Sequence, residues 1–339
     1  MIDLLVAGGG PVGLATALYA RRADLEVAVI EPRTHTIDKA CGEGLMPEAV
    51  ARLADLGVDP VGREFDGIRY VAGERSAEAR FSAGPGRGVR RTTLHEALRQ
   101  RARDAGVRIV TDRVTDVQQT SGGVAANGMT ARYLIGADGL HSTVRAAVGL
   151  HAHASGGQRF GVRQHFRIEP WTDLVEVHWQ AATEVYITPV ANDVIGIAVL
   201  GGRPLGLAQA IGAIPRLAKR LADAEATSTE RGAGPLRQAT SARTSGRVLL
   251  VGDAAGYVDA LTGEGLRIGF AEAQAAIDAI LRDDPASYED EWTRITRSYR
   301  NLTNGLLWAA DRPPLRRLIV PSARAVPWAF RRIVDAIAD

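Results

Sequence analysis

The stretch LLVAGGGPVGLATALYARRADLEVAVIE, residues 4–31, decides the fold of this chain. It opens with an apolar run of the length of one buried strand, and a second apolar run follows a helical pattern and ends at Glu31. Three glycines at G-x-G-x-x-G spacing separate the first run from the helical pattern: Gly8, Gly10 and Gly13. A strand, a glycine-rich turn, a helix and a strand in this order predict a β-α-β unit.

Each part of this unit suits a dinucleotide. Gly8 permits the tight turn, Gly10 lets a pyrophosphate approach the backbone, and Gly13 lets the helix pack on the strand. Pro11 suits the first turn of a helix, whose unpaired N–H groups attract phosphate oxygens. Glu31 can accept hydrogen bonds from both hydroxyls of an adenosine ribose, and an acid there argues against a 2′-phosphate. The stretch therefore predicts FAD or NAD rather than NADP.

Composition bounds the kind of protein. The chain has 339 residues, of which 46% are hydrophobic and 24% charged, as in a soluble globular protein of one or two domains. A net charge of +2 gives no field that would attract nucleic acid. Cys41 is the only cysteine, which excludes an intrachain disulfide and fits a reducing compartment. The first strand begins without a preceding signal peptide, and no apolar run is long enough to cross a membrane, so we expect a cytoplasmic protein.

The composition and hydrophobic periodicity of the sequence change between about residues 157 and 200. This part alternates and is rich in β-branched and aromatic residues, which predicts an antiparallel sheet inserted between α/β segments. A helical pattern covers 206–224, one buried strand lies within 246–252, and a long helix is predicted over 266–281. Shorter elements are expected before the sheet: a loop over 32–47, a helix over 47–56, strands over 65–72 and 77–81, a flexible break over 84–88, a helix over 92–105, and strands over 113–119 and 130–135.

Two further motifs follow the first in a fixed order. GADGLHSTVR (136–145) follows a predicted strand, and GRVLLVGDAAGYVDALTGEGL (246–266) leads from a strand to a helix. Together with the first stretch they resemble the flavoprotein family of para-hydroxybenzoate hydroxylase, which also holds aromatic monooxygenases, halogenases and geranylgeranyl reductases. RTTLHEAL (91–98) is similar to the R-x-x-L-x-x-x-L pattern of that family at the start of a helix. The resemblance extends over residues 1–281.

The resemblance implies an α/β fold, with a Rossmann-type FAD-binding domain, an inserted antiparallel β-sheet that binds substrate, and a helical C-terminus. It implies FAD as the cofactor. NAD(P)H would act as a transient reductant, because the chain has no second G-x-G-x-x-G stretch for a nicotinamide domain. The implied divisions are a discontinuous FAD-binding domain (1–64, 89–155 and 241–300), a substrate-binding domain (65–88 and 156–240) and C-terminal helices (301–339).

The resemblance also implies roles for single residues. Asp253 matches the Asp that binds the flavin ribityl chain, and a carboxylate at the end of a buried strand needs such hydroxyl donors; the alternative is a cap for the next helix. Asp138 matches an Asp-Gly motif linked to FAD and nicotinamide, or fixes its own turn. Arg91 resembles the Arg near the flavin phosphates, or is an exposed Arg at a helix start. The cofactor-binding residues predicted in this way are Gly8, Gly10, Pro11, Val12, Gly13, Glu31, Pro32, Arg33, Cys41, Gly42, Arg91, Val114, Asp138, Gly139, Gly252, Asp253, Gly263, Gly265 and Leu266.

The loop CGEGL (41–45) separates branches of the family. It resembles the C-G-G/E-G-L loop of geranylgeranyl-reductase-like members, which lies beside the isoalloxazine. Cys41 is therefore the one candidate catalytic residue, and the alternative is a small buried hydrophobe. Glu43 is a candidate substrate contact; the alternatives are that it orders the loop or lies at the surface.

Three aromatic residues of the predicted sheet are candidates to line a substrate cavity, and the alternative is that they belong to the core. They are Phe166, Trp179 and Tyr186. Oxygen activation on a reduced flavin needs a dry, shaped cavity of this kind. His151 and His153 lack a third ligand nearby, so no metal site is predicted.

From these features we expect an FAD-dependent monooxygenase that uses NAD(P)H and oxygen to hydroxylate an aromatic, polyketide-like or other apolar small molecule. The alternative, favoured by the Cys41 loop, is a geranylgeranyl-reductase-like flavin reductase that saturates C=C bonds. A non-catalytic flavin-binding protein is a minor alternative, because such a module needs no large substrate sheet. The oligomeric state is left open.

The C-terminal segment has the composition of a membrane-surface helix. From residue 312 on, arginines outnumber acids and lie beside Trp328, Phe330 and other apolar residues. The favoured alternative is that these apolar residues cover the flavin domain while arginines face solvent. Pro321 and Pro327 also interrupt any continuous membrane-lying helix.

Overall fold

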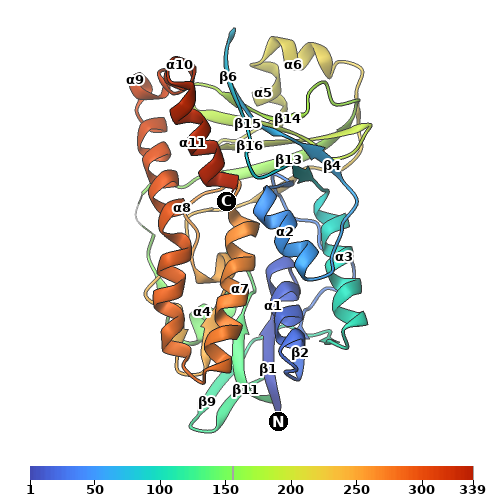
Figure 1. Ribbon diagram of the computed structural model, residues 1–339, viewed down its shortest axis with the longest axis vertical. Helices are drawn as coiled ribbons and strands as arrows, with labels where there is room; N and C mark the ends of the chain where they lie inside the picture. Colours follow the sequence, from blue (N-terminus) through green and yellow to red (C-terminus); the bar gives the residue numbers. More distant parts are fainter. Residues whose placement is uncertain (155, 339) are drawn as a thin grey trace.

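The computed structural model describes residues 1–154 and 156–338. Two large sheets lie at opposite ends of the molecule (Figure 1). The long helix α8 (Tyr288–Ala310) runs beside both, because it buries Tyr288 and Trp292 in the core of one sheet and Leu307 in that of the other. The fold class predicted from the sequence is confirmed.

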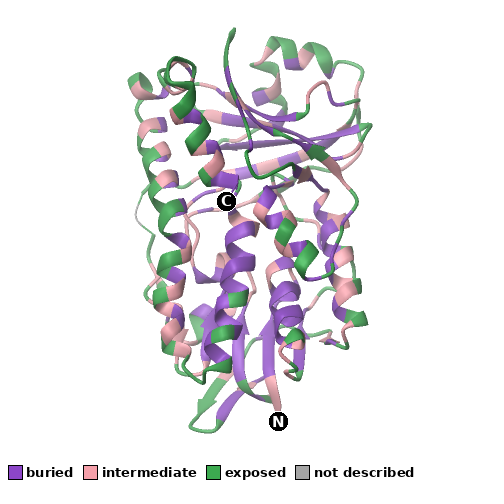
Figure 2. Cartoon of the chain, in the orientation of Figure 1, coloured by how far each residue is buried: buried purple, intermediate pink, exposed green. Residues whose placement is uncertain are grey.

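The first sheet contains the β-α-β unit. Its central strands are parallel, and β1 pairs with β2 on one side and β11 on the other, with Leu5 opposite Ala28 and Leu134. The order is β20 (Thr244–Ser245), β21 (Val248–Leu250), β11 (Met129–Gly136), β1 (Ile2–Ala7), β2 (Val27–Ile30) and β8 (Arg108–Val110). Helices α1 (Pro11–Arg22) and α7 (Gly265–Leu281) cover it and are mostly buried with the strands (Figure 2). Continuous apolar runs suit strands covered by helices in this way.

A hairpin extends β11, where the sequence predicts strands over 113–119 and 130–135. It consists of β9 (Val117–Thr120) and β10 (Gly123–Ala126), and β10 pairs with β11. β10 is not among the predicted strands, because its residues, Gly-Val-Ala-Ala, carry little of the β-branched signal that marks strands.

The second sheet is antiparallel except where β14 pairs with β5. Its order is β17 (Glu225–Ala226), β13 (Phe160–Arg167), β16 (Val194–Gly201), β15 (Thr183–Pro189), β14 (Leu174–Trp179), β5 (Gly67–Ala72) and β6 (Arg75–Arg80), and β18 (Arg231–Ala233) also pairs with β13. The single helix predicted over 206–224 is two short helices, α5 (Leu207–Gly212) and α6 (Pro215–Arg220), because Pro215 begins a new helix.

Two regions predicted to lack regular structure contribute strands to a small three-stranded sheet. It consists of β3 (Gly44–Leu45), β7 (Gly86–Gly88) and β4 (Arg63–Phe65). The flexible break predicted over 84–88 is therefore wrong for β7. A Cβ on Gly88 would lie 1.7 Å from the carbonyl oxygen of Pro189, so glycine here permits close packing rather than flexibility. A fourth, two-stranded sheet pairs β12 (His151–Ala152) with β19 (Ala239–Thr240).

The remaining helices are α2 (Pro47–Asp55), α3 (Arg91–Asp104), α4 (Thr143–Ala147), α9 (Pro313–Arg316), α10 (Ile319–Ala325) and α11 (Pro327–Ala338). Short 3₁₀ turns span Gly252–Ala255 and Pro285–Ser287. Val320, Phe330 and Val334 of the last helices pack with Tyr70 and other residues of the second sheet. The C-terminal segment thus covers the antiparallel sheet, whereas the sequence favoured the flavin domain. Within the described ranges, none of the helices has the length and hydropathy of a membrane span.

Candidate functional site

A cavity of about 310 Å³ lies where the parallel strands end. In parallel sheets, ligands bind in the crevice outside the carboxyl ends of the strands. The cavity reaches from this edge to the face of the antiparallel sheet. It is lined by most of the residues predicted from the sequence: Gly8, Gly10, Pro11, Val12, Glu31, Pro32, Arg33, Cys41, Gly42, Glu43, Arg91, Val114, Asp138, Gly139, Tyr186, Gly252, Asp253, Gly263, Gly265 and Leu266.

The glycine turn after β1 brings the backbone to the cavity. Gly8 has a φ of +104°, and a Cβ there would lie 2.6 Å from the carbonyl oxygen of Ala137. At Gly13 a Cβ would lie 1.9 Å from the oxygen of Gly8, so this glycine packs the helix on the turn and does not line the cavity. A Cβ on Gly10 would be within 4 Å of Arg91 Nη2 alone among the described residues, and α1 begins after it without a side-chain cap. The first N–H groups of α1 therefore remain for a ligand.

Arg91 is a buried cation beside this turn. Its side chain is almost wholly buried, and its Nε has no hydrogen-bond partner among the described residues. A terminal nitrogen, Nη2, lies 3.8 Å from the position of a Cβ on Gly10. Burial lowers the pKa of Arg91. A buried guanidinium is unfavourable unless it is paired with an anion, so this position fits the pyrophosphate of a dinucleotide.

The carboxylate of Glu31, predicted to bind the adenosine ribose, also accepts hydrogen bonds from within the protein. Its Oε2 accepts a hydrogen bond from Gly9 N at 2.8 Å, and its Oε1 accepts from Arg33 Nε at 2.7 Å. Burial tends to raise the pKa of Glu31, but these bonds outweigh it and hold the pKa below its usual value. Ribose hydroxyls would have to share the carboxylate with Arg33, whose side chain is 41% exposed.

Two aspartates border the cavity at the ends of β11 and β21. Asp138 Oδ2 accepts from Thr143 N at 2.7 Å and Val144 N at 3.1 Å, while its buried Oδ1 has no partner within the described parts of the chain. Asp138 thus fixes the start of α4, as the alternative interpretation held, and keeps one oxygen for a ligand. Asp253 lies inside the 3₁₀ turn, whose N-cap position is Val251. Its carboxylate remains available for ribityl hydroxyls, and the capping alternative does not apply.

Arg145, which has no predicted role, joins these two loops. This buried Arg donates to the carbonyl oxygens of Leu140 at 2.7 Å and Ala254 at 3.0 Å. Arg145 is the last residue of the second motif, GADGLHSTVR, so the motif could have marked it as a candidate. Its contact with Ala254 O could not be predicted, because it joins two segments that are distant in the sequence.

The Cys41 loop is fixed by a network of buried polar residues. Glu43 has a φ of +61°; its Oε1 accepts from Arg91 N at 2.8 Å, and its Oε2 lies 2.6 Å from His165 Nε2. His165 Nδ1 lies 2.8 Å from the hydroxyl of Ser228 and 3.2 Å from Arg163 Nη1. Because Arg163 can only donate, Nδ1 accepts and Nε2 carries the proton that it donates to Glu43. Glu43 thus orders the loop and also lines the cavity.

Cys41 is one of the residues that line the cavity. Its Sγ accepts a hydrogen bond from Glu43 N at 3.4 Å. Burial raises the pKa of the Cys41 thiol, so the sulfur keeps its proton at neutral pH. A protonated thiol is a much weaker nucleophile than a thiolate.

The prediction for the three aromatic residues needs correction. Only Tyr186 lines the cavity, and its hydroxyl donates to Leu261 O at 2.7 Å. Phe166 packs against the cluster under α5 and α6, because successive residues of β13 face opposite sides and Arg163 and His165 take the side of the cavity. Trp179 packs edge-on against Tyr70 at 5.4 Å between ring centroids, within the cluster of the C-terminal helices.

The wall at the antiparallel sheet is aliphatic instead. It is formed by Ile68, Val175, Val177, Ala198, Leu200 and Leu236. Few polar groups interrupt it, so this half of the cavity suits an apolar chain or ring.

Three features of the site fit FAD: the carboxyl edge of the parallel sheet, the glycine turn beside the buried Arg91, and Asp253 in the turn after β21. Together they define an FAD-dependent oxidoreductase. The chain belongs to the FAD binding domain family, which matches residues 1–281. It is 28% identical to the menaquinone reductase of Mycolicibacterium smegmatis over 331 residues, covering 88% of this chain and 80% of that protein. It is 25% identical to a digeranylgeranylglycerophospholipid reductase of Methanothrix thermoacetophila over 329 residues, covering 86% and 82%.

A solved structure shows the same fold. The flavoprotein/dehydrogenase from Cytophaga hutchinsonii matches with a TM-score of 0.87, over 99% of this chain and 92% of that chain. The two sequences are 17% identical, so this likeness concerns the fold alone.

Proposed function

We propose that this protein is a flavin reductase that saturates a carbon–carbon double bond in an isoprenoid or similarly apolar chain. This is the alternative predicted from the sequence, and it replaces the monooxygenase as the favoured activity. The observation that carries it is a continuous cavity in which the Cys41 loop lies between the ends of the parallel strands and an aliphatic wall. The names of the two relatives support it, since both are reductases and one acts on a geranylgeranyl lipid.

Each partner in the reaction has a place in the cavity. FAD would be held by the turn after β1, Arg91 and Asp253, and in its reduced form it supplies a hydride. Saturation of a double bond also requires one proton on the other carbon. Cys41 Sγ–H is placed to give it, because burial keeps the thiol protonated and it faces the same cavity as Leu200 and Val177. NAD(P)H is the proposed reductant that returns FAD to its reduced form.

The experiment that tests this function separates hydrogen addition from oxygen addition. FAD on the enzyme is reduced photochemically without oxygen, and the enzyme is then mixed with a panel of isoprenoid, phenol and polyketide compounds. We expect an isoprenoid product that is heavier by two hydrogens in mass spectrometry. A product that carries one added oxygen, formed only in air with NAD(P)H and matched by oxygen uptake, would replace the reductase with the monooxygenase.

The surface of the C-terminal helices suits a substrate that resides in lipid. Trp308, Leu318 and Trp328 are 56%, 54% and 68% exposed. Arg317, in the turn between α9 and α10, and Arg331 of α11 are also exposed. Apolar side chains among arginines are typical of contact with an anionic lipid surface, so we propose a weak, salt-sensitive membrane contact. The sequence alone favoured the opposite, because it did not show which apolar residues stay exposed.

A further inference from the structure

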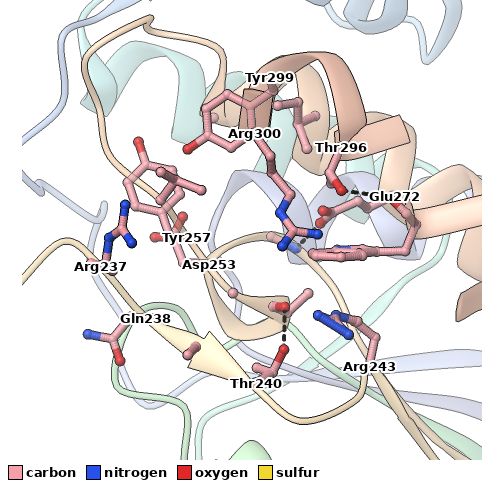
Figure 3. A pocket seen from close by; sticks show the side chains of 18 of the residues that line it. Arg237, Gln238, Thr240, Arg243, Asp253, Tyr257, Glu272, Thr296, Tyr299 and Arg300 are labelled. Carbon is pink, nitrogen blue, oxygen red and sulfur yellow. Dashed lines mark hydrogen bonds between the residues drawn. The ribbon is translucent and has the colours of Figure 1, made fainter. Parts of the chain in front are cut away.

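A second cavity, of about 210 Å³, lies behind the loop that follows β21 (Figure 3). It is bordered by this loop, by α7 and α8, by the segment 237–243, and by His153 and Ala154. Gly252, Asp253, Tyr257 and Gly265 line both cavities, so one wall separates them. None of the roles assigned above uses the space on this side of the wall.

Three arginines from two separate parts of the chain border the cavity. Figure 3 shows Arg237 on one side and Arg300 and Arg243 on the other, with Asp253 and Tyr257 between them. Arg237 and Arg243 belong to the segment around β19, and Arg300 comes from α8. The fold therefore gathers positive charge that is not adjacent in the sequence.

The arginines on one side are held by an aromatic ring. The guanidinium carbons of Arg243 and Arg300 lie 3.7 Å and 5.1 Å from the centroid of Trp292. Throughout residues 1–154 and 156–338, no carboxylate forms an ion pair with Arg300, and the buried Nε of Arg243 has no hydrogen-bond partner. The guanidinium of Arg243 makes a long contact with Glu289, at 3.5 Å, and the backbone N of Arg243 donates to the same carboxylate. Stacking on a ring fixes a guanidinium while leaving its N–H groups free to donate.

Other polar groups of the wall are already engaged. Thr240 donates to Ala255 O at 2.9 Å, and Gln238 donates to Pro235 O at 2.9 Å. Arg237 donates to Asn304 at 2.8 Å. Glu272 and Asp253 supply the carboxyl groups of the wall; burial raises the pKa of Glu272 to about 8, so it is uncharged at neutral pH. The arginines that line the cavity therefore outnumber its charged carboxylates.

We propose that this second cavity binds a phosphate or diphosphate group, either free or as the end of a larger ligand. Guanidinium groups recognise phosphate oxygens through paired N–H donors, and Arg243 and Arg300 face Arg237 across the space. The volume lies below the ~300 Å³ at which sites for whole drug-sized ligands begin. The site thus holds a small anion or one charged end. It is independent of which flavin reaction the first cavity performs.

The bound anion would act on the flavin side through the shared wall. Asp253 faces the second cavity and is also the residue that we expect to bind the ribityl chain. An anion among the arginines would change the electrostatic potential at this carboxylate over a short distance.

Titration with inorganic pyrophosphate tests the site. FAD-bound protein is titrated by calorimetry at low ionic strength, in the wild type and in the variants Arg300→Gln and Arg237→Gln. Arg297→Gln is the matched control, because Arg297 is an exposed arginine of the same helix and does not line the cavity. We expect the wild type and the control to bind alike and each of the other variants to bind at least tenfold more weakly. FAD absorbance and a melting curve check that each variant is folded.

Three results would overturn the proposal: no pyrophosphate binding by the wild type at millimolar concentration, unchanged binding in both Arg300→Gln and Arg237→Gln, or an equal loss in Arg297→Gln. The second variant keeps the test decisive if the first does not fold. Competition then identifies the source of the phosphate. Displacement of pyrophosphate by NADPH but not NADH indicates a 2′-phosphate, displacement by both indicates a dinucleotide pyrophosphate, displacement by geranylgeranyl diphosphate indicates an isoprenoid head group, and no displacement indicates a free anion.

Discussion

Replacement of Glu272 by glutamine should change how stability depends on pH. Glu272 lies on α7, is 2% exposed, and accepts a hydrogen bond from Gly252 N at 2.6 Å. Burial raises its pKa from 4.5 to about 8. Between these values the folded protein keeps a proton that the unfolded chain has lost. The free energy of unfolding therefore falls as pH rises through this window, because the folded state binds more protons.

The size of the effect follows from the shift. Each pH unit inside the window changes the free energy of unfolding by about 1.4 kcal/mol. Between pH 5 and pH 7 the free energy of unfolding of the wild type should therefore fall by at most roughly 2.7 kcal/mol relative to that of Glu272→Gln. With an unfolding entropy of about 2.1 cal/mol/K per residue, this is a difference of roughly 4 °C in melting temperature. Glutamine keeps an oxygen that can accept from Gly252 N.

This difference in melting temperature is measured by calorimetric melting of FAD-saturated protein at pH 5, 6, 7 and 8. The gap in melting temperature between Glu272→Gln and the wild type should widen with pH and stop widening above about pH 8. Asp278→Asn, at an exposed carboxyl of the same helix, is the control and should run parallel to the wild type. Parallel curves for Glu272→Gln and the wild type would refute the assignment of a neutral, buried carboxyl.

Three further predictions concern the first cavity and the surface. Asp253→Ala should weaken FAD binding about 10- to 150-fold, since a hydrogen bond to a charged group contributes roughly 1.5–3 kcal/mol; unchanged FAD retention on gel filtration would mean that Asp253 does not bind the cofactor. Cys41→Ala should keep FAD but slow product formation in the anaerobic assay, and a variant equal to the wild type in rate and product would make Cys41 structural. Wild-type protein should float with anionic liposomes at low salt and Trp328→Ala should float less; protein that stays in the soluble fraction would contradict the membrane contact.

Sequence alone determined those parts of the site whose residues are adjacent in the chain. A glycine turn after a strand, with an acid at the end of the next strand, has one common structural solution, so Gly8, Gly10 and Glu31 could be placed without coordinates. Asp138 and Asp253 were identified through the family resemblance of their motifs, and each lies in the turn that follows a buried strand. Parallel strands end at one edge of a sheet, which brings these separate motifs to a single cavity.

Tertiary structure decided which side of a strand faces the cavity and which distant segments meet. Alternation along β13 separates Phe166 from His165, but it does not say which face is covered by α5 and α6. Glu31 pairs with Arg33 through a side-chain orientation that no spacing specifies. The second cavity depends on Arg237 and Arg300, which lie 63 positions apart and meet because α8 packs beside the loop after β21. A local pattern determines backbone form within a few residues, whereas burial of apolar faces between elements determines which side chains come together.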